Sequence, residues 1–270
     1  MKHLTKLLAA ALLALGLNQA VWADDASDFR ETLQLAEQGN AEAQNNLGLM
    51  YHIGQGVRQN YVEALRWFRR AAAQRNVSAQ FNLGVMYYGG QGVRQDYAEA
   101  FRWFRKAAEQ GDTEAQFNLG VMYENGRGVR QDDIEAVKWF RQAAAQGLAP
   151  AQYNLGWMYA NGRGVRQDDT EAVRWYRKAA EQEYAEAQYN LGLMYASGHG
   201  VRQDDTEAVK WFRQAAAQGY ALAQYNLGIM YYSGRGVRQD RALAQEWFGK
   251  ACQNGDQDGC NNYQRLKAGY

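Results

Sequence analysis

The side chains that could act as nucleophile, general base or metal ligand are few in this sequence. After residue 23 it contains two histidines, His52 and His199, and four serines: Ser27, Ser78, Ser197 and Ser233. None of these serines begins a Ser-x-x-Lys motif or lies at the centre of Gly-x-Ser-x-Gly. His199 lies in a Gly-His-Gly loop without an orienting partner, which favours solvent exposure over catalysis. Because catalysis needs such groups gathered in one pocket, we expect no enzyme, no cofactor and no metal site.

Two cysteines, Cys252 and Cys260, lie eight residues apart near the C-terminus. They could form a disulfide, a reactive thiol pair or part of a metal site. No histidine or third cysteine lies near them, which argues against the last two. Their spacing crosses a predicted helix–loop–helix corner, and a disulfide is expected there if the chain is exported to an oxidising compartment.

The first 23 residues have the pattern of a cleavable signal peptide. Lys2 and Lys6 precede an apolar run of 11 residues, 7–17, which is too short to span a bilayer as a helix. Val21-Trp22-Ala23 fits a signal-peptidase site, so we expect cleavage after Ala23 and a periplasmic or secreted protein. The alternative is an N-terminal membrane anchor. Cleavage would change the formal net charge from +1 to −1, because two lysines and no acidic residue are removed.

A 36-residue period runs through the rest of the chain. Asn-Leu-Gly recurs six times at this period, from 46–48 to 226–228, and Gly-Val-Arg-Gln keeps the same register. The predicted repeats span 40–75, 76–111, 112–147, 148–183, 184–219 and 220–255. Residues 24–39 are expected to form an N-terminal capping helix and 256–270 a C-terminal cap. Such caps cover the apolar end faces of a stack of helix pairs.

The third repeat illustrates why each unit should form two helices. Asp112 can cap a first helix whose apolar positions follow the spacing of one helical face. Glycines at 126 and 128 then interrupt the pattern. Asp132 precedes a second helix, and Glu135 completes a pair typical of a capping box. Gly48 and its equivalents, with the Ala-Ala pairs of the second helix, should let the two helices approach closely.

The pattern A-x-A-Q-Y-N-L-G-x-M-Y, G-x-G-V-x-Q-D, then E-A-x-x-W-Y/F-x-x-A-A-x-x-G resembles the Sel1-like repeat family, which is related to the tetratricopeptide repeat. The resemblance covers residues 40–255. It implies an all-α, right-handed α/α superhelix with the first helices on the concave side, and a role as an adaptor or scaffold for proteins. Cysteine-rich members join repeats by disulfides at the spacing of Cys252 and Cys260. Some of those members are described as binding or hydrolysing β-lactams, which is the alternative function.

One asparagine per repeat is the main candidate for ligand binding. In tetratricopeptide relatives this Asn faces the groove, where its carboxamide can bond a peptide backbone. The alternative is a hydrogen bond within its own repeat that orders the helix pair. The predicted asparagine ladder is Asn46, Asn82, Asn118, Asn154, Asn190 and Asn226.

Aromatic side chains precede most of these asparagines and should flank them on the same helix face. They are Phe81, Phe117, Tyr153, Tyr189 and Tyr225, with Asn45 at the first place. Trp157, three residues after Asn154, either packs internally or is exposed in the groove. The repeat's own tryptophans are expected in the core. They are Trp67, Trp103, Trp139, Trp175, Trp211 and Trp247.

The charge pattern gives no argument for nucleic acid. The second helices carry cations, such as Arg66, Arg69 and Arg102, but acidic residues alternate with them, which is typical of a solvated convex face. We therefore expect a protein or peptide partner, no nucleic acid, and no membrane-spanning segment in the mature chain.

Overall fold

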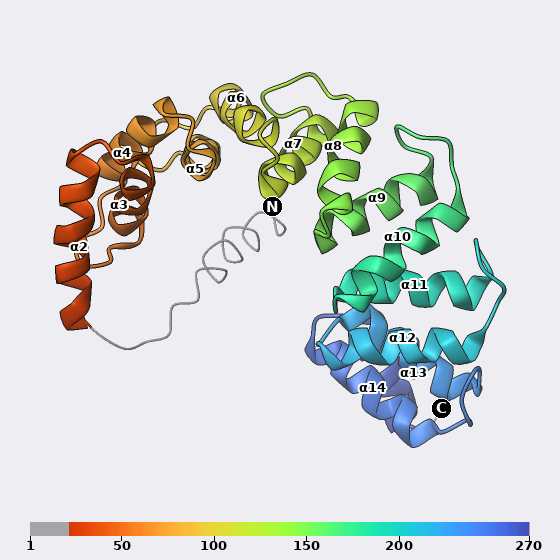
Figure 1. Ribbon diagram of the computed structural model, residues 1–270. Coiled ribbons are helices and arrows are strands. Elements are labelled where there is room, and N and C mark those ends of the chain that lie inside the picture. The colour runs from red at the N-terminus through yellow and green to blue at the C-terminus, as the bar shows by residue number, and fades with distance from the viewer. Residues whose placement is uncertain (1–21, 270) are drawn as a thin grey trace. The chain divides into compact units, whose positions relative to one another are not determined.

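The computed structural model describes residues 22–269, and this range contains helices and no strand (Figure 1). The chain divides into two compact units, an N-terminal unit ending at Gln95 and a C-terminal unit beginning at Asp96. Of the predicted signal peptide, only Trp22 and Ala23 are described, as the first residues of α2. The cleavage site stays a prediction.

The N-terminal unit contains a capping helix, the first repeat and the first helix of the second repeat. Its elements are α2 (Trp22–Glu37), α3 (Ala41–Ile53), α4 (Tyr61–Ala73) and α5 (Val77–Gly89). Three of these helices surround a small core of Ala36, Ala43, Leu47 and Trp67. The predicted N-terminal helix is therefore present and packs on the first repeat.

The C-terminal unit continues the alternation of first and second helices and ends in a final short helix. Its elements are α6 (Tyr97–Ala108), α7 (Thr113–Asn125), α8 (Asp133–Ala145), α9 (Ala149–Asn161), α10 (Asp169–Glu181), α11 (Ala185–Ser197), α12 (Asp205–Ala217), α13 (Ala221–Ser233), α14 (Arg241–Gln253) and α15 (Gln257–Lys267). Within this unit each helix packs against its neighbours in the chain. The predicted all-α solenoid of helix pairs is confirmed, and its right-handed winding stays a prediction.

The helix caps predicted for the third repeat are present with one exception. Asp112 accepts the N–H of Ala115 at 2.7 Å, and Asp132 accepts the N–H groups of Ile134 and Glu135, both at 3.0 Å. The predicted capping box at Glu135 is wrong. The carboxylate of Glu135 pairs with Lys138 instead. The N–H of Asp132 is already used, because it donates to a carbonyl at the end of α7.

The core is built between repeats as well as within them. Val173 and Tyr176 of α10 pack with Leu191 and Met194 of α11, and Trp211 of the next second helix covers this cluster. An equivalent cluster lies one repeat further on. Because each helix pair completes the core of its neighbour, stability should be a sum over adjacent repeats.

Close contacts at glycine set the spacing of the helices. A Cβ on Gly120 of α7 would lie 2.5 Å from the ring of Phe140 in α8, as the predicted close approach requires. In the loop between α9 and α10, a Cβ on Gly164 would lie 2.1 Å from the carbonyl oxygen of Asp133, the first residue of α8. Gly92, Gly128, Gly200 and Gly236 likewise meet the carbonyl group at the start of the preceding second helix. The loop of one repeat therefore packs directly against the start of the second helix of the repeat before it.

Buried glutamines form a second link between repeats that the sequence analysis missed. Gln188 of α11 donates to the carbonyl oxygen of Ala180 in α10 at 3.1 Å and accepts from Gln218, the C-cap of α12, at 2.8 Å. Gln44, Gln116, Gln152 and Gln224 make the same pair of bonds, with Asn254 as the donor to Gln224. Each glutamine therefore joins three successive helices.

The predicted disulfide is present between Cys252 and Cys260, whose Cα atoms lie 4.5 Å apart. Thirty-six residues earlier, the same two places hold Ala216 and Gln224, which are joined by a hydrogen bond. The disulfide thus replaces the bond between repeats at the last junction of the chain. It ties α15 to α14 at the end of the stack, where no further repeat follows among the described residues.

Candidate functional site

The candidate binding site is the face of the first helices that carries the asparagine ladder. Each first helix has 13 residues and is followed by a glycine C-cap, so its asparagine always occupies the same turn. The structure places the six asparagines differently with respect to solvent. Asn46 is exposed, and the other five are half-buried.

In the C-terminal unit the asparagines bond to their own helix and to the preceding repeat. The amide of Asn118 donates to the carbonyl oxygen of Glu114 at 2.8 Å. Asn226 donates to the carbonyl oxygen of Leu222 at 2.9 Å and lies 3.5 Å from the hydroxyl of Tyr189. Burial raises the pKa of Tyr153, and a hydrogen bond with Asn190 opposes that rise. These bonds are internal to the protein, but they lie within one helix or cross to the repeat before, and none of them joins the two helices of a pair.

In the N-terminal unit, a hydrogen bond between two asparagines joins successive first helices. The amide of Asn82 donates to Oδ1 of Asn45 at 3.0 Å, and Asn45 is buried at the place where later repeats have an aromatic ring. The amide of Asn45 in turn lies 3.5 Å from Oδ1 of Asn46. Three asparagines from two successive first helices are thereby joined, and Asn46 is the member that faces solvent.

The aromatic residues before the asparagines pack against the core with one side of their rings. The rings of Phe117, Tyr153, Tyr189 and Tyr225 each pack, tilted, against the aromatic ring of their own second helix. The centroid distances lie between 5.7 and 6.0 Å. Phe117 is only 4 % exposed, so it offers almost no surface to a ligand. The three tyrosines and Phe81 are half-buried and retain an outer edge.

Trp157 of α9 lies beside a cluster of charged groups from α7, α8 and the loop after α9. Its indole is half-buried, and the guanidinium of Arg163 lies 5.1 Å from the ring centroid. Arg163 also pairs with Asp133 at 2.6 Å and with Glu124 at 3.6 Å. Burial raises the pKa of Glu124, while the charge of Arg163 acts in the opposite direction. Trp157 is thus held by a cation on one side and remains partly accessible.

The repeat's own tryptophans are less buried than expected. Trp67 is 5 % exposed, as predicted for a core residue. The other five are half-buried, which corrects the expectation of a core position. The physical reason is a place at the border of the core: Trp211 and Trp247, for example, pack against the buried core clusters without belonging to them. The ammonium groups of Lys106, Lys178 and Lys250 lie 4.0–4.1 Å from the centroids of Trp103, Trp175 and Trp247.

A hollow of about 350 Å³ opens beside Asn46 in the N-terminal unit. It lies between α2 and α3, where Glu31 and Thr32 of the capping helix face Asn46 and Leu49. Asn46 belongs to the predicted asparagine ladder, and Leu49 occupies the same place in its repeat as Trp157 does in its own. The hollow therefore presents an exposed carboxamide next to apolar surface, the combination that can bond a peptide backbone while covering an apolar side chain.

The residues with catalytic potential are not gathered into a pocket. Nε2 of His52 bonds Gln91 at 2.9 Å. Oγ of Ser197 lies 3.1 Å from Nδ1 of His199 on an exposed loop, but it donates to the carbonyl oxygen of Leu193 at 2.8 Å. Between residues 22 and 269, no three His, Cys, Asp or Glu side chains are grouped so as to hold a metal ion. In the same range, no helix combines the length and apolar character needed to cross a bilayer.

The model of the Sel1 repeat family matches the chain six times, over residues 41–76, 77–112, 113–148, 149–184, 185–220 and 221–256. A search of curated proteins found no match. Among solved structures, the chain is 42% identical to a protective antigen of uropathogenic Escherichia coli strains that displays an SLR fold. That match covers 86% of this chain and 50% of the antigen with a TM-score of 0.84, so the chain spans about half of the antigen's length. A Sel1 repeat protein from Oxalobacter formigenes is 37% identical, with 83% of this chain and 99% of that chain covered and a TM-score of 0.71.

Proposed function

The chain belongs to the Sel1 repeat family, and on that premise we propose that it is an exported protein–protein interaction module. Proteins with Sel1 repeats are generally modules for protein–protein interaction, and a protein partner is the expectation at that level. The proposal adds a location for binding, the face of the first helices, and a compartment outside the cytoplasm. The module is a scaffold with no catalytic role.

The observation that carries the proposal is the exposed Asn46 beside the hollow of about 350 Å³. The asparagines of later repeats are half-buried, and two of them, Asn82 and Asn226, also contact the preceding first helix. A carboxamide has two donor hydrogens and an acceptor oxygen, so one internal bond leaves capacity for a ligand. In the C-terminal unit, Trp157 and the outer edges of Tyr153, Tyr189 and Tyr225 supply apolar surface on the first helices.

Export is supported by two independent features of the chain. The N-terminal segment has the charge, apolar run and cleavage pattern of a signal peptide. The only two cysteines form a disulfide, and such bonds persist in oxidising compartments. We propose a periplasmic or secreted location on these grounds.

The experiment begins with the mature protein as bait in an extract of the cell envelope of its source organism. The most enriched protein is identified by mass spectrometry, purified and titrated against wild type and variants. Replacing the interface tryptophan, Trp157→Ala, should weaken binding about 30-fold, the size of a typical hot-spot loss.

The matched control is Trp175→Ala. Trp175 is also half-buried and also has a cation over its ring, but it lies on a second helix. Its replacement should change the affinity less than about twofold, as expected for a residue outside the interface. Equal losses in the two variants, with both proteins still folded by circular dichroism, would show that the first-helix face is not the binding surface.

A further inference from the structure

One exposed arginine recurs at the same position in every repeat. It follows valine in Gly-Val-Arg-Gln, and the six copies are Arg58, Arg94, Arg130, Arg166, Arg202 and Arg238. All six are exposed, and within residues 22–269 none of them forms a hydrogen bond, ion pair or cation–π contact. Neighbouring invariant residues have internal roles in most repeats: the glycine contacts a carbonyl group of the preceding second helix, and in four repeats the glutamine bonds back to the first helix.

A nearby position that is exposed in every repeat differs between repeats, which makes the constancy of this arginine informative. It is the second residue of the second helix, which is Val, Ala, Ile or Thr. A surface position that has no internal partner is free to vary. The retention of arginine in all six copies therefore points to a contact outside the chain.

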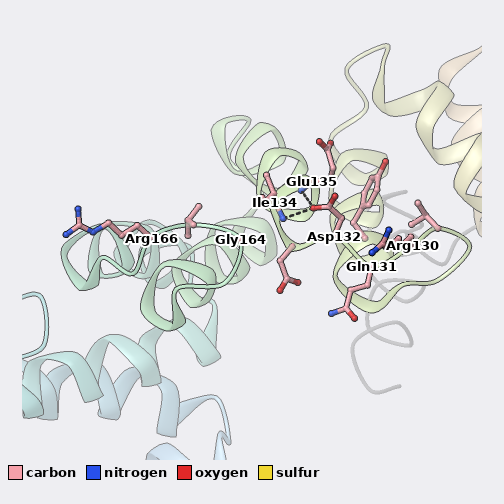
Figure 2. Close-up of a pocket in the computed structure, with 11 residues that line it drawn as sticks. Arg130, Gln131, Asp132, Ile134, Glu135, Gly164 and Arg166 are labelled. Carbon is pink, nitrogen blue, oxygen red and sulfur yellow. Dashed lines mark hydrogen bonds between the residues drawn. The ribbon is translucent and has the colours of Figure 1, made fainter.

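Two of these arginines line one hollow of about 1000 Å³ in the C-terminal unit. Arg130 and Arg166 lie on either side of it, with the start of α8 between them (Figure 2). Ile134, at that helix start, is 59 % exposed and also lines the hollow. None of the ladder asparagines or their aromatic neighbours belongs to its lining, so this surface is distinct from the first-helix face.

Each carboxylate that lines the hollow already has a hydrogen-bond or ion-pair partner within the protein. Asp133 accepts two bonds from the guanidinium of Arg163, at 2.6 and 3.1 Å. Glu135 pairs with Lys138, and Asp132 accepts the two N–H groups of its helix cap. The two arginines are the charged groups of the lining without a partner there. An exposed apolar side chain between two uncommitted guanidinium groups is complementary to an apolar side chain between two carboxylates.

We infer that this hollow binds an acidic segment of a partner protein, in which an apolar side chain lies between carboxylates. Each carboxylate accepts two parallel N–H bonds from one arginine, and the apolar side chain covers Ile134. The apolar contact distinguishes such a segment from a phosphate- or sulfate-bearing polymer, which offers charge alone. This surface can bind or fail to bind whether or not the first-helix face has a partner.

The test uses the mature protein and a fluorescein-labelled peptide with a leucine between pairs of glutamates, followed by fluorescence anisotropy in dilute salt. The double variant Arg130→Gln/Arg166→Gln should weaken binding about tenfold or more, since each arginine supplies bonds to a charged group. Ile134→Ser should weaken it several-fold. A peptide with serine in place of leucine should bind wild type as weakly as the leucine peptide binds Ile134→Ser.

The matched control is Arg102→Gln/Arg174→Gln, which removes the same charge from exposed residues of second helices in the same unit. These two arginines already pair with Glu99 and Glu171. Their loss should change binding less than about twofold, because only bulk charge is altered. Equal weakening by both double variants, or no binding by wild type, would overturn the inference. It would also be overturned if heparin displaced the peptide and Ile134→Ser had no effect, since a polyanion would then be the ligand.

Discussion

Gly164 lies in close contact with the carbonyl group of Asp133. We therefore predict that Gly164→Ala is among the most destabilising small substitutions in the C-terminal unit. Two costs add. Gly164 has φ +66°, in the left-handed region where an L side chain costs about 1–2 kcal/mol. Its new Cβ would lie 2.1 Å from the carbonyl oxygen of Asp133, and relieving such overpacking costs about 1–3 kcal/mol more. The expected loss in free energy of unfolding is therefore about 2–5 kcal/mol.

Gly147 provides the control that separates the two costs. It has φ +96°, so an alanine is strained there too, but nothing lies within 4 Å of its Cβ position. Gly147→Ala should lose only the backbone cost of about 1–2 kcal/mol. Both variants are measured by urea unfolding with circular dichroism. Amide hydrogen exchange should show faster opening at the start of α8 in Gly164→Ala. Equal stabilities of the two variants, with unchanged exchange at α8, would refute the claim that this contact joins the repeats.

Three further predictions concern the other devices that hold the repeats together. Removing the disulfide with Cys252→Ala/Cys260→Ala should lower the free energy of unfolding by about 2–3 kcal/mol, with α15 the first helix to lose protection from hydrogen exchange. Gln188 is 2 % exposed, so Gln188→Leu should cost about 1–3 kcal/mol in urea unfolding by leaving a carbonyl unpaired, whereas exposed Gln214→Leu should cost almost nothing. Burial raises the pKa of Tyr220 from 10.0 to about 12, so its contribution to stability is complete below pH 10 and is lost as the pH rises to about 12. Stability measured across that range should therefore fall less steeply in Tyr220→Phe, and an identical slope would contradict the shift.

The repeat architecture could be predicted because its determinants are local and periodic. Asp112 caps its helix through a residue three positions later, and Gly120 meets Phe140 within the same repeat. Such contacts depend on helix geometry and the 36-residue period alone. The disulfide was predictable for a similar reason, since its two cysteines lie on either side of one helix–loop–helix corner.

Contacts between repeats could not be predicted, because they depend on how adjacent helix pairs are seated. Asn226 approaches a hydroxyl 37 residues earlier, and Gln188 joins helices on both sides of its own. The invariance of this glutamine was a signal that sequence reasoning left unused. The half-burial of five repeat tryptophans was also missed, since apolar spacing does not distinguish a ring inside the core from one that packs against the border of the core.

The most direct test of the account is a hydrogen-exchange footprint of the mature protein with and without its captured partner. Binding on the first-helix face predicts slower exchange in the first helices, above all near Asn46 and Trp157, and unchanged exchange in the outward parts of the second helices. Slower exchange confined to the second helices, with the first helices unchanged, would contradict the account.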